Sequence, residues 1–287
     1  MKLSIGIIGL PNVGKSTFFQ FLTKLQVNIA NYPFTTINPN AGVVAVSDER
    51  LEKIAQIFHS PKILPFPLEF VDIAGLVKGA HEGQGLGNQF LAQVRECDAL
   101  VHLIRVFQNP EVAHLEGEID PLRDFEIIQN ELGYKDLESK EKINLLSKKP
   151  QFILINGKKE EVPEKFLEYL GSKNLPYLVI DLSSDSFVDS DVFVVLDRCK
   201  ELLNLLTFFT ANENEARSWL VKQGTEIKKA AGLVHTDFEQ KFIRAEVIQW
   251  DKLLGAGSWH QAKAKGLLRL EGREYLVQEG DVIFFKI

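Results

Sequence analysis

Residues 9–16 read Gly-Leu-Pro-Asn-Val-Gly-Lys-Ser, which matches the phosphate-binding loop pattern of a glycine, four variable residues and Gly-Lys-Ser. The apolar run Ile5–Ile8 precedes the loop and predicts a strand, while Ser16–Phe19 begins a predicted helix. A strand, a glycine-bounded turn and a helix N-terminus form an anion site, because the free backbone N–H groups and the helix dipole both attract negative charge. The sequence therefore predicts a nucleoside triphosphate site.

The loop residues have separate expected roles in that site. Backbone N–H groups wrap the β-phosphate, Lys15 reaches the β- and γ-phosphates as a catalytic cation, and the Ser16 hydroxyl binds Mg²⁺. Asn12 has two interpretations: its side-chain oxygen binds a K⁺ ion beside the phosphates, or the residue only braces the loop. The predicted nucleotide-binding residues of the loop are Asn12, Val13, Gly14, Lys15, Ser16 and Thr17.

A second motif closes the apolar stretch Leu68–Asp72, which predicts a strand ending in an aspartate. An aspartate at this place holds the Mg²⁺ shell in phosphate-binding-loop enzymes, so Asp72 is a predicted metal-site residue. Gly75 would bring its N–H to the γ-phosphate, and 79–87, with four glycines, predicts a switch loop rather than a plain linker. Thr36 is the first choice to complete the Mg²⁺ shell, although it and the preceding threonine are also typical of an ordinary turn.

The composition of the 287-residue chain is typical of a globular protein, with 45% hydrophobic and 25% charged residues. No apolar stretch is long enough to span a bilayer and the N-terminus shows no signal-peptide pattern, so we expect a cytoplasmic protein. Cys97 and Cys199 lack metal-ligand spacing and are expected to be buried thiols. The net charge of −6 argues against strong non-specific binding to nucleic acid.

Strand and helix patterns alternate along the first part of the chain. The predicted strands are Leu3–Gly9, Val43–Val46, Leu68–Asp72, Leu100–Arg105, Phe152–Asn156 and Tyr177–Asp181, and the predicted helices are Lys15–Lys24, Asp48–Phe58, Gly87–Arg95 and Asp191–Leu206. This alternation predicts an α/β fold with a mainly parallel sheet, helices on both faces and ligand-binding loops at the strand carboxyl ends. We place this nucleotide-binding domain at 1–203, with a polar helical insertion at 121–149.

The pattern changes after residue 203, and 204–287 predicts a second, small α+β domain. Its strand-like runs, separated by glycine-containing turns, are Thr207–Thr210, Phe242–Ile248, Glu274–Val277 and Val282–Ile287. A basic face for ribosomal RNA or a protein partner is one interpretation of its cations, and a normal mixed-charge surface is the other. The residues of this candidate basic face are Lys222, Lys228, Lys229, Lys241 and Arg244.

Taken in order, these motifs resemble those of the Obg-like superfamily and, within it, the YchF/Obg-like ATPase family. The resemblance covers nearly the whole chain and rests on Asn31–Thr36, Asp72–Ala80 and Gly83–Phe90, while Ala230–Phe238 resembles the TGS domain, a ubiquitin-like β-grasp module. It implies slow ATP hydrolysis and a role around the ribosome. Members usually carry a long helical-hairpin arm, and 121–149 leaves room only for one helix or a stub.

The segment expected to read the base departs from the family. Guanine-specific switches have Asn-Lys-x-Asp, whose aspartate accepts the guanine protons, whereas residues 156–159 read Asn-Gly-Lys-Lys here. The family has a glutamate at the fourth place, which Lys159 replaces, although Glu160 follows directly. Asn156 and Ser183 are the predicted base-side residues. ATP is the expected nucleotide, with GTP as the alternative.

Leu76 occupies the place at which Ras-like enzymes carry the glutamine that orients the attacking water. Because leucine cannot hydrogen-bond water, hydrolysis is slow or another group positions the nucleophile. His114 matches a histidine proposed as catalytic in the family, and His81 in the predicted switch loop is the second candidate. The further alternative is that a partner completes the site. His102, within an apolar strand, is expected to be a satisfied core residue.

The main interpretation is a monomeric ATP-hydrolysing switch whose nucleotide state controls binding to the ribosome. One alternative is a GTPase with unusual base recognition. Another, from a different class, is a nucleotide-gated binding module with negligible turnover, which Leu76, Lys159 and the short arm favour.

Overall fold

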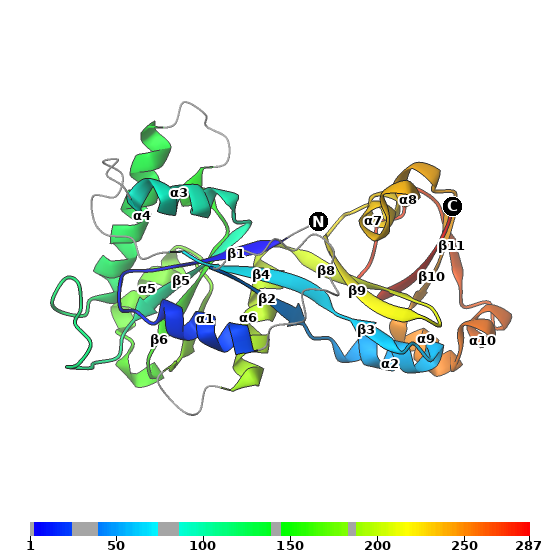
Figure 1. Cartoon of the computed structure of the whole chain (residues 1–287), viewed down its shortest axis with the longest axis horizontal. Helices are drawn as coiled ribbons and strands as arrows, with labels where there is room; N and C mark the ends of the chain where they lie inside the picture. The colour runs from blue at the N-terminus through cyan, green and yellow to red at the C-terminus, as the bar shows by residue number, and fades with distance from the viewer. Residues whose placement is uncertain (1–2, 25–39, 74–85, 139–144, 183–187) are drawn as a thin grey trace. The chain divides into compact units, whose positions relative to one another are not determined.

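The computed structural model describes residues 3–24, 40–73, 86–138, 145–182 and 188–287. These residues form two compact units (Figure 1). The large unit comprises the described residues within 2–44 and 68–203, and the small unit comprises 45–67 and 204–287. The chain therefore leaves the large unit at residue 45, returns to it at residue 68 and leaves it again at residue 204.

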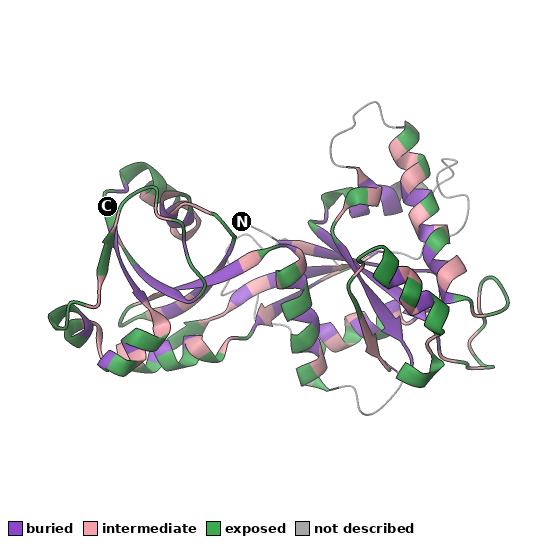
Figure 2. Cartoon of the chain, turned by 180° about the vertical axis from the view of Figure 1, so that it is seen from behind, coloured by how far each residue is buried: buried purple, intermediate pink, exposed green. Residues whose placement is uncertain are grey.

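A six-stranded sheet with the order β2-β4-β1-β5-β6-β7 forms the centre of the large unit. Its strands are β1 (Ser4–Ile8), β2 (Ala41–Val46), β4 (Phe66–Asp72), β5 (Ala99–Arg105), β6 (Gln151–Asn156) and β7 (Tyr177–Ile180). The pairs β1/β4, β1/β5, β5/β6 and β6/β7 are parallel. Every residue of β5 and β6 is buried (Figure 2), as expected of central strands that helices cover on both faces.

Helices lie on both sides of this sheet. In Figure 1, α1 (Lys15–Lys24) and α6 (Asp189–Leu202) lie on one side, and α3 (Leu86–Glu96) and α4 (Pro121–Glu138) lie on the other. Phe125 of α4 and Phe166 of α5 (Glu164–Ser172) share one apolar cluster with Ile104 and Ile153 of the sheet. The predicted α/β fold, with a mainly parallel sheet between two layers of helices, is confirmed.

The parallel direction of β1, β4, β5, β6 and β7 brings their carboxyl ends to the same edge of the sheet. Open α/β sheets bind their ligands at this edge. The residues that the strands deliver there are the phosphate-binding loop after β1, Asp72, Arg105, Asn156 and, just after β7, Leu182. The fold therefore brings together groups that are far apart in sequence.

The small unit has its own six-stranded sheet, in the order β11-β10-β12-β8-β9-β3. Its strands are β3 (Lys62–Leu64), β8 (Leu205–Ala211), β9 (Glu215–Lys222), β10 (Arg244–Gln249), β11 (Arg269–Glu271) and β12 (Asp281–Lys286), and its helices are α2 (Glu49–Phe58), α7 (Ile227–Val234), α8 (Thr236–Lys241), α9 (Trp250–Ala256) and α10 (Trp259–Ala264). A β8/β9 hairpin is followed by α7, and β12 then pairs parallel with β8 and antiparallel with β10. This is the arrangement of a ubiquitin-like β-grasp.

Residues 45–67 belong to the small unit, whereas the sequence analysis placed them in the domain 1–203. Leu51 and Ile54 of α2 share a buried cluster with Phe209 and Ala216, and β3 pairs parallel with β9. The prediction of a continuous first domain was therefore wrong over this segment. An amphipathic pattern shows which face of a helix is apolar, but it does not show which core that face covers.

Some element bounds also differ from the prediction. The last helix of the large unit ends at Leu202 rather than residue 206, because Asn204 has a φ of 52° and the chain turns into β8. Residues 274–277 form no strand and contribute only an isolated bridge between Glu226 and Leu276. Helix α5 and strands β3, β9 and β11 were not predicted. Across the described ranges, no helix combines the length and apolar character needed to cross a membrane.

The polar insertion is short, as predicted. It contains α4 and one 3₁₀ turn, Leu146–Lys148, with 139–144 outside the described residues. The Asp136 carboxylate near the end of α4 accepts hydrogen bonds from the N–H groups of Leu146 and Ser147, at 2.8 and 2.9 Å. These two bonds join the helix directly to the turn that precedes β6.

Candidate nucleotide-binding site

The phosphate-binding loop has a backbone conformation that only particular residues adopt easily. Gly14 has a φ of 103°, and a Cβ atom placed there would lie 2.5 Å from Asn156 Nδ2. Asn12 has a φ of 63°, in the left-handed region that asparagine tolerates better than most residues. The Phe18 N–H then donates to the Gly14 carbonyl at 2.9 Å, which begins α1. The local sequence thus produces the predicted turn and helix N-terminus.

Lys15 is buried, and its ammonium donates to the carbonyl oxygens of Gly9 and Leu10 at 3.0 and 2.8 Å. Burial lowers the pKa of Lys15 to about 8, and the nearby Asp72 carboxylate opposes this shift. Burial in turn raises the pKa of Asp72, and Lys15 opposes that shift. The two carbonyls occupy the ammonium, so phosphate oxygens would replace them when a nucleotide binds.

Ser16 and Asp72 are the described members of the predicted Mg²⁺ site. Their hydroxyl and carboxylate oxygens suit Mg²⁺, which typically takes one or two protein ligands together with phosphate oxygens and water. The Asp72 N–H donates to the Asn40 carbonyl at 2.9 Å, which holds its main chain at the end of β4. The described part of the chain contains no cluster of three or more His, Cys, Asp or Glu residues that would hold a metal alone. The donor set therefore fits a Mg²⁺ ion that arrives with phosphate.

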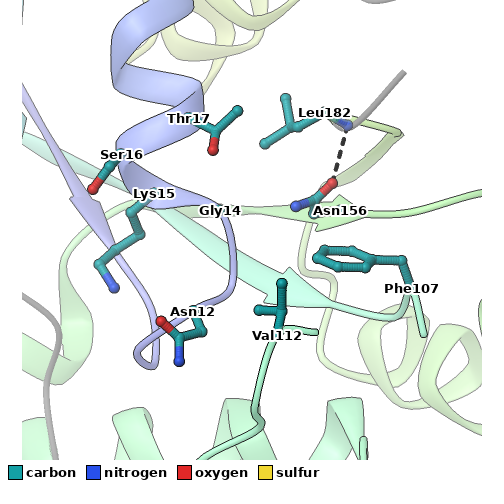
Figure 3. Close-up of a pocket in the computed structure, with 9 residues that line it drawn as sticks. All are labelled: Asn12, Gly14, Lys15, Ser16, Thr17, Phe107, Val112, Asn156 and Leu182. Atoms are coloured by element: carbon teal, nitrogen blue, oxygen red, sulfur yellow. Dashed lines mark hydrogen bonds between the residues drawn. The ribbon is translucent and has the colours of Figure 1, made fainter. Parts of the chain in front are cut away.

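A cavity of about 290 Å³ lies against the phosphate-binding loop (Figure 3). Its lining residues are Asn12, Gly14, Lys15, Ser16, Thr17, Phe107, Val112, Asn156 and Leu182. Six of these were predicted from the sequence. Phe107, Val112 and Leu182 were missed, although Phe107 and Leu182 each follow the carboxyl end of a predicted parallel strand by about two residues, where ligand-contacting groups are expected.

Asn156 joins three parts of this site. Its Nδ2 donates to the Val13 carbonyl of the phosphate-binding loop at 2.9 Å, and its Oδ1 accepts from the Leu182 N–H at 3.0 Å. The side chain is buried at the end of β6. Asn156 thus fixes the phosphate-binding loop relative to the residue that follows β7, and it does so through backbone atoms.

The loop after β5 forms the other wall of the cavity. Phe107 and Val112 lie on one side of the cavity in Figure 3, and Thr17 and Leu182 lie on the other. Asn12 Nδ2 donates to the Ala113 carbonyl of this loop at 3.1 Å. The bracing role considered for Asn12 therefore has a partner in the structure.

His114, the first candidate for the catalytic histidine, is held in a buried pair with Asp124. Its Nε2 lies 2.7 Å from Asp124 Oδ2, and the two side chains are only 3% and 1% exposed. The Glu116 N–H donates to His114 Nδ1 at 3.2 Å, so this nitrogen is the acceptor and Nε2 carries the proton toward Asp124. Burial raises the pKa of Asp124, while Arg123 and His114 oppose the shift. Both ring nitrogens are occupied, and His114 does not line the cavity.

The base-reading segment does not bring a carboxylate to the cavity. Lys159 and Glu160 begin a 3₁₀ turn, Lys159–Glu161, and both are exposed. Glu161 accepts a hydrogen bond from the Lys158 N–H at 2.7 Å, so it serves to close that turn. Glu160 therefore does not take the place of the missing glutamate in this structure. Five predicted site positions lie outside the described residues, namely Thr36, Gly75, Leu76, His81 and Ser183.

Two further expectations about buried side chains have different outcomes. Cys97 and Cys199 are buried thiols, as predicted, and burial raises the pKa of each. His102 is fully buried and stacked on Phe125, as expected of a core residue. Neither ring nitrogen makes a well-formed hydrogen bond with a described residue, but the Gln151 side chain interacts with the ring and favours its charged form. Burial lowers its pKa to about 3, and the ring is neutral.

Comparisons with known proteins agree with this geometry. A family profile described as a 50S ribosome-binding GTPase matches residues 4–157, and one for the C-terminal region of YchF GTPases, described as a protein of unknown function, matches 205–287. The chain is 39% identical to the ribosome-binding ATPase YchF of Mycoplasma genitalium, over 99% of both proteins. It is 36% identical to Obg-like ATPase 1 of Gallus gallus, over 99% of this chain and 92% of that protein.

The solved structure of the YchF GTPase of Schizosaccharomyces pombe superposes on this chain with a TM-score of 0.84 at 29% identity, covering 99% of this chain and 98% of the other. Fold and site together define a phosphate-binding-loop nucleoside triphosphatase. Within that class, the chain belongs to the YchF family of Obg-like ATPases. The alignment with the M. genitalium protein spans 362 positions against 287 residues here, so at least 75 of its positions have no residue in this chain. Since both proteins are covered almost end to end, this shortening is internal.

Proposed function

We propose that this protein is a ribosome-associated, cytoplasmic and monomeric switch that binds ATP with Mg²⁺ and hydrolyses it slowly. One observation carries the choice of ATP: none of the described residues that line the cavity has a carboxylate. Guanine presents N1–H and amino donors that guanine-reading switches pair with an aspartate, whereas adenine needs no such anionic acceptor. The apolar side chains of Phe107, Val112 and Leu182, with the Asn156 amide, therefore favour adenine.

The phosphates would be held by the loop between β1 and α1. Its N–H groups wrap the β-phosphate, Lys15 moves from the Gly9 and Leu10 carbonyls to the β- and γ-phosphates, and Ser16 and Asp72 hold the metal. When bound, Mg²⁺ neutralises charge that develops on the phosphate oxygens. In this proposal the Thr36 hydroxyl completes the Mg²⁺ shell, and the Gly75 N–H donates a hydrogen bond to the γ-phosphate.

Slow turnover follows from the absence of a water-orienting glutamine at Leu76. His114 remains the proposed catalytic residue, and it would have to release Glu116 N–H before Nδ1 could accept a proton from water. Asn12 has no hydrogen-bond partner for its side-chain oxygen among the described residues, which supports the proposed K⁺ ion beside the phosphates. Ser183 is the proposed residue near the base, beside Asn156.

A binding module with negligible turnover is the second candidate, and the His114 pair favours it, because both ring nitrogens already have partners. The names of the relatives support the ribosome as partner in either case. The candidate basic face gives weaker support, since Lys241 pairs with Asp237 at 3.1 Å and Lys229 lies 3.9 Å from Glu226, as on a mixed-charge surface.

The first test is calorimetric titration of ATP and of GTP into nucleotide-free protein with Mg²⁺. We expect ATP to bind at least about tenfold more tightly, a difference of 1.4 kcal/mol. Equal or tighter binding of GTP would rule out the adenine assignment. Single-turnover hydrolysis with and without ribosomes, in K⁺ and in Na⁺, then separates the switch from the module: no phosphate release under any condition supports the module, and equal rates in the two salts argue against the K⁺ ion.

A further inference from the structure

Arg105 ends β5 and is the largest fully buried side chain of the described residues, with 2% of its surface exposed. Among those residues, no carboxylate forms an ion pair with its guanidinium. The charge is instead satisfied by three backbone carbonyls: Nε donates to Phe107 at 3.0 Å, and the two terminal nitrogens donate to Val112 at 3.0 Å and Asn109 at 3.4 Å. The Asp124 carboxylate lies near enough to favour the charged form of Arg105 without a direct ion pair, so main-chain oxygens supply the hydrogen bonds to this buried cation. Burying a cation in this way is energetically demanding, so its retention needs a reason.

These three carbonyls belong to one loop, and the guanidinium closes that loop on itself. Residues 106–109 have no regular secondary structure, and the Asn109 carbonyl accepts one further bond, from the Val112 N–H at 3.2 Å, so the guanidinium supplements this turn. The guanidinium also lies 4.3 Å from the centre of the Phe107 ring, which is in cation–π range. Arg105 therefore sets both the path of the loop and the position of this ring.

The same loop supplies the cavity wall. Phe107 and Val112, whose carbonyls Arg105 holds, both line the cavity (Figure 3). The main chain of these two residues, from which the side chains project, cannot shift without breaking a hydrogen bond from the buried guanidinium. The phosphate-binding loop depends on Arg105 far less, because it meets this loop only through the bond from Asn12 to the Ala113 carbonyl.

We propose that Arg105 is a positioning residue for the nucleoside part of the nucleotide: it places the apolar wall formed by Phe107 and Val112 and so sets the affinity for the base. The proposal rests on the triphosphate site assigned above, and it does not depend on which purine is preferred. A guanidinium that merely stabilised the core would affect all ligands of the site alike. A guanidinium that positions the wall affects only ligands that carry a base.

The experiment compares two probes, ATP and inorganic tripolyphosphate, each titrated with Mg²⁺ into wild-type, Arg105→Gln and Arg105→Lys protein. We expect Arg105→Gln to weaken ATP binding roughly tenfold, because all three charge-assisted hydrogen bonds to the loop are lost, including the two to wall residues, and to leave tripolyphosphate binding within about twofold. Arg105→Lys should fall between wild type and Arg105→Gln. The matched control is Arg198→Gln, an exposed arginine of the same unit that pairs with Glu201, which should change neither affinity.

Parallel losses for both probes in Arg105→Gln would overturn the proposal. If that variant does not fold, Phe107→Ala and Val112→Ala, which keep Arg105, must reproduce the split between ATP and tripolyphosphate, and unchanged ATP affinity in both would also overturn it. A wild-type protein that binds ATP no more tightly than tripolyphosphate has no base contact to position. That result would contradict the role proposed for Arg105 but would leave the phosphate site supported. If the wild-type protein bound neither probe, the proposed function itself would be wrong.

Discussion

On the phosphate side of the cavity, one short loop supplies its own geometry, whereas the base side is assembled from segments that are far apart in sequence. The phosphate side depends on the conformations of Asn12 and Gly14 and on one buried lysine, all within eight residues. The base side depends on side chains that bond to backbone atoms of other segments, as Asn156 does to Val13 and Leu182. The comparison teaches that a substitution can impair one side of the cavity without impairing the other. Measuring the affinities for ATP and for tripolyphosphate shows which side a substitution has impaired.

The largest effect is expected from Lys15→Ala, which acts on the phosphate side. Loss of a cation that makes charge-assisted bonds to two phosphates should weaken ATP and tripolyphosphate equally, by about 100-fold or more. Calorimetry with both probes measures this effect. Lys24→Ala, at the exposed end of the same helix, is the matched control and should bind as wild type. Losses below about tenfold in Lys15→Ala would mean that backbone N–H groups alone dominate phosphate binding.

Asn156→Ala should give the next largest effect on binding. It should weaken both ATP and tripolyphosphate, because Asn156 contacts both sides of the cavity. It leaves the Val13 carbonyl and the Leu182 N–H without their buried partners, so we expect losses of about 10- to 50-fold for ATP and a smaller loss for tripolyphosphate. Asn156→Asp keeps the acceptor for Leu182 and removes the donor to Val13. Asn156→Asp should therefore weaken tripolyphosphate binding more than it changes the preference for ATP over tripolyphosphate. Because both variants lack the donor to Val13, equal behaviour of the two would show that the bond from the Leu182 N–H contributes nothing to binding.

The pH dependence of binding should arise from the phosphate side of the cavity alone, through the ionisation of Lys15. The pKa of Lys15 is lowered to about 8 in the free protein, and bound phosphate favours the charged ammonium, so binding takes up a proton above pH 8. Affinity should thus be independent of this group below about pH 8 and fall by roughly tenfold per pH unit as the pH rises above it. Titration in buffers of different ionisation heats measures the proton uptake, and circular dichroism confirms that the protein stays folded. A slope seen for ATP but not for tripolyphosphate would place the titrating group on the base side instead.

Leu182→Ala should give the smallest change in affinity and should act on the base side only. Removing part of the apolar wall should weaken ATP binding by about fivefold and leave tripolyphosphate unchanged. Because Leu182 is buried, the variant should also unfold more easily, by about 2–5 kcal/mol. Leu170→Ala, a buried leucine of α5 in the same unit, is the control for that destabilisation and should keep wild-type affinity for both probes. Equal ATP affinity in the two variants would remove Leu182 from the base wall.

The same contrast explains what could be predicted from the sequence. The phosphate-binding loop, Asp72 and the parallel sheet follow from local patterns, since spacing, glycine positions and apolar runs are written in consecutive residues. Val112 carries no such pattern, and Phe107 carries only the general one of its place two residues after a strand. Their place in the cavity depends on Arg105, whose role appears only when its three carbonyl partners are seen. Burial of Arg105 is also unexpected from residue type, because arginines are seldom fully buried without an ionic partner.

The domain assignment failed for a related reason. Helix α2 has a regular apolar face, as a helix between two strands of a parallel sheet would have, and the next predicted strand, Leu68–Asp72, does lie in the large unit. Only the contacts of Leu51 and Ile54 with Phe209 and Ala216 show that this face packs in the small unit. His114 is a further case, because its partner Asp124 lies ten residues away and on a different element.

The excursion of residues 45–67 also affects the order in which the protein can fold during its synthesis. Helix α2 is complete at residue 58, yet the strands it packs against begin at residue 205. A nascent chain that has reached residue 203 contains every strand of the large sheet, while α2 and β3 still lack their partners. Such an arrested chain should be cut by protease within 45–67, and the finished protein should resist. The small unit can form only after residues 204–287 have been translated, so residues 45–67 wait for partners that are made much later.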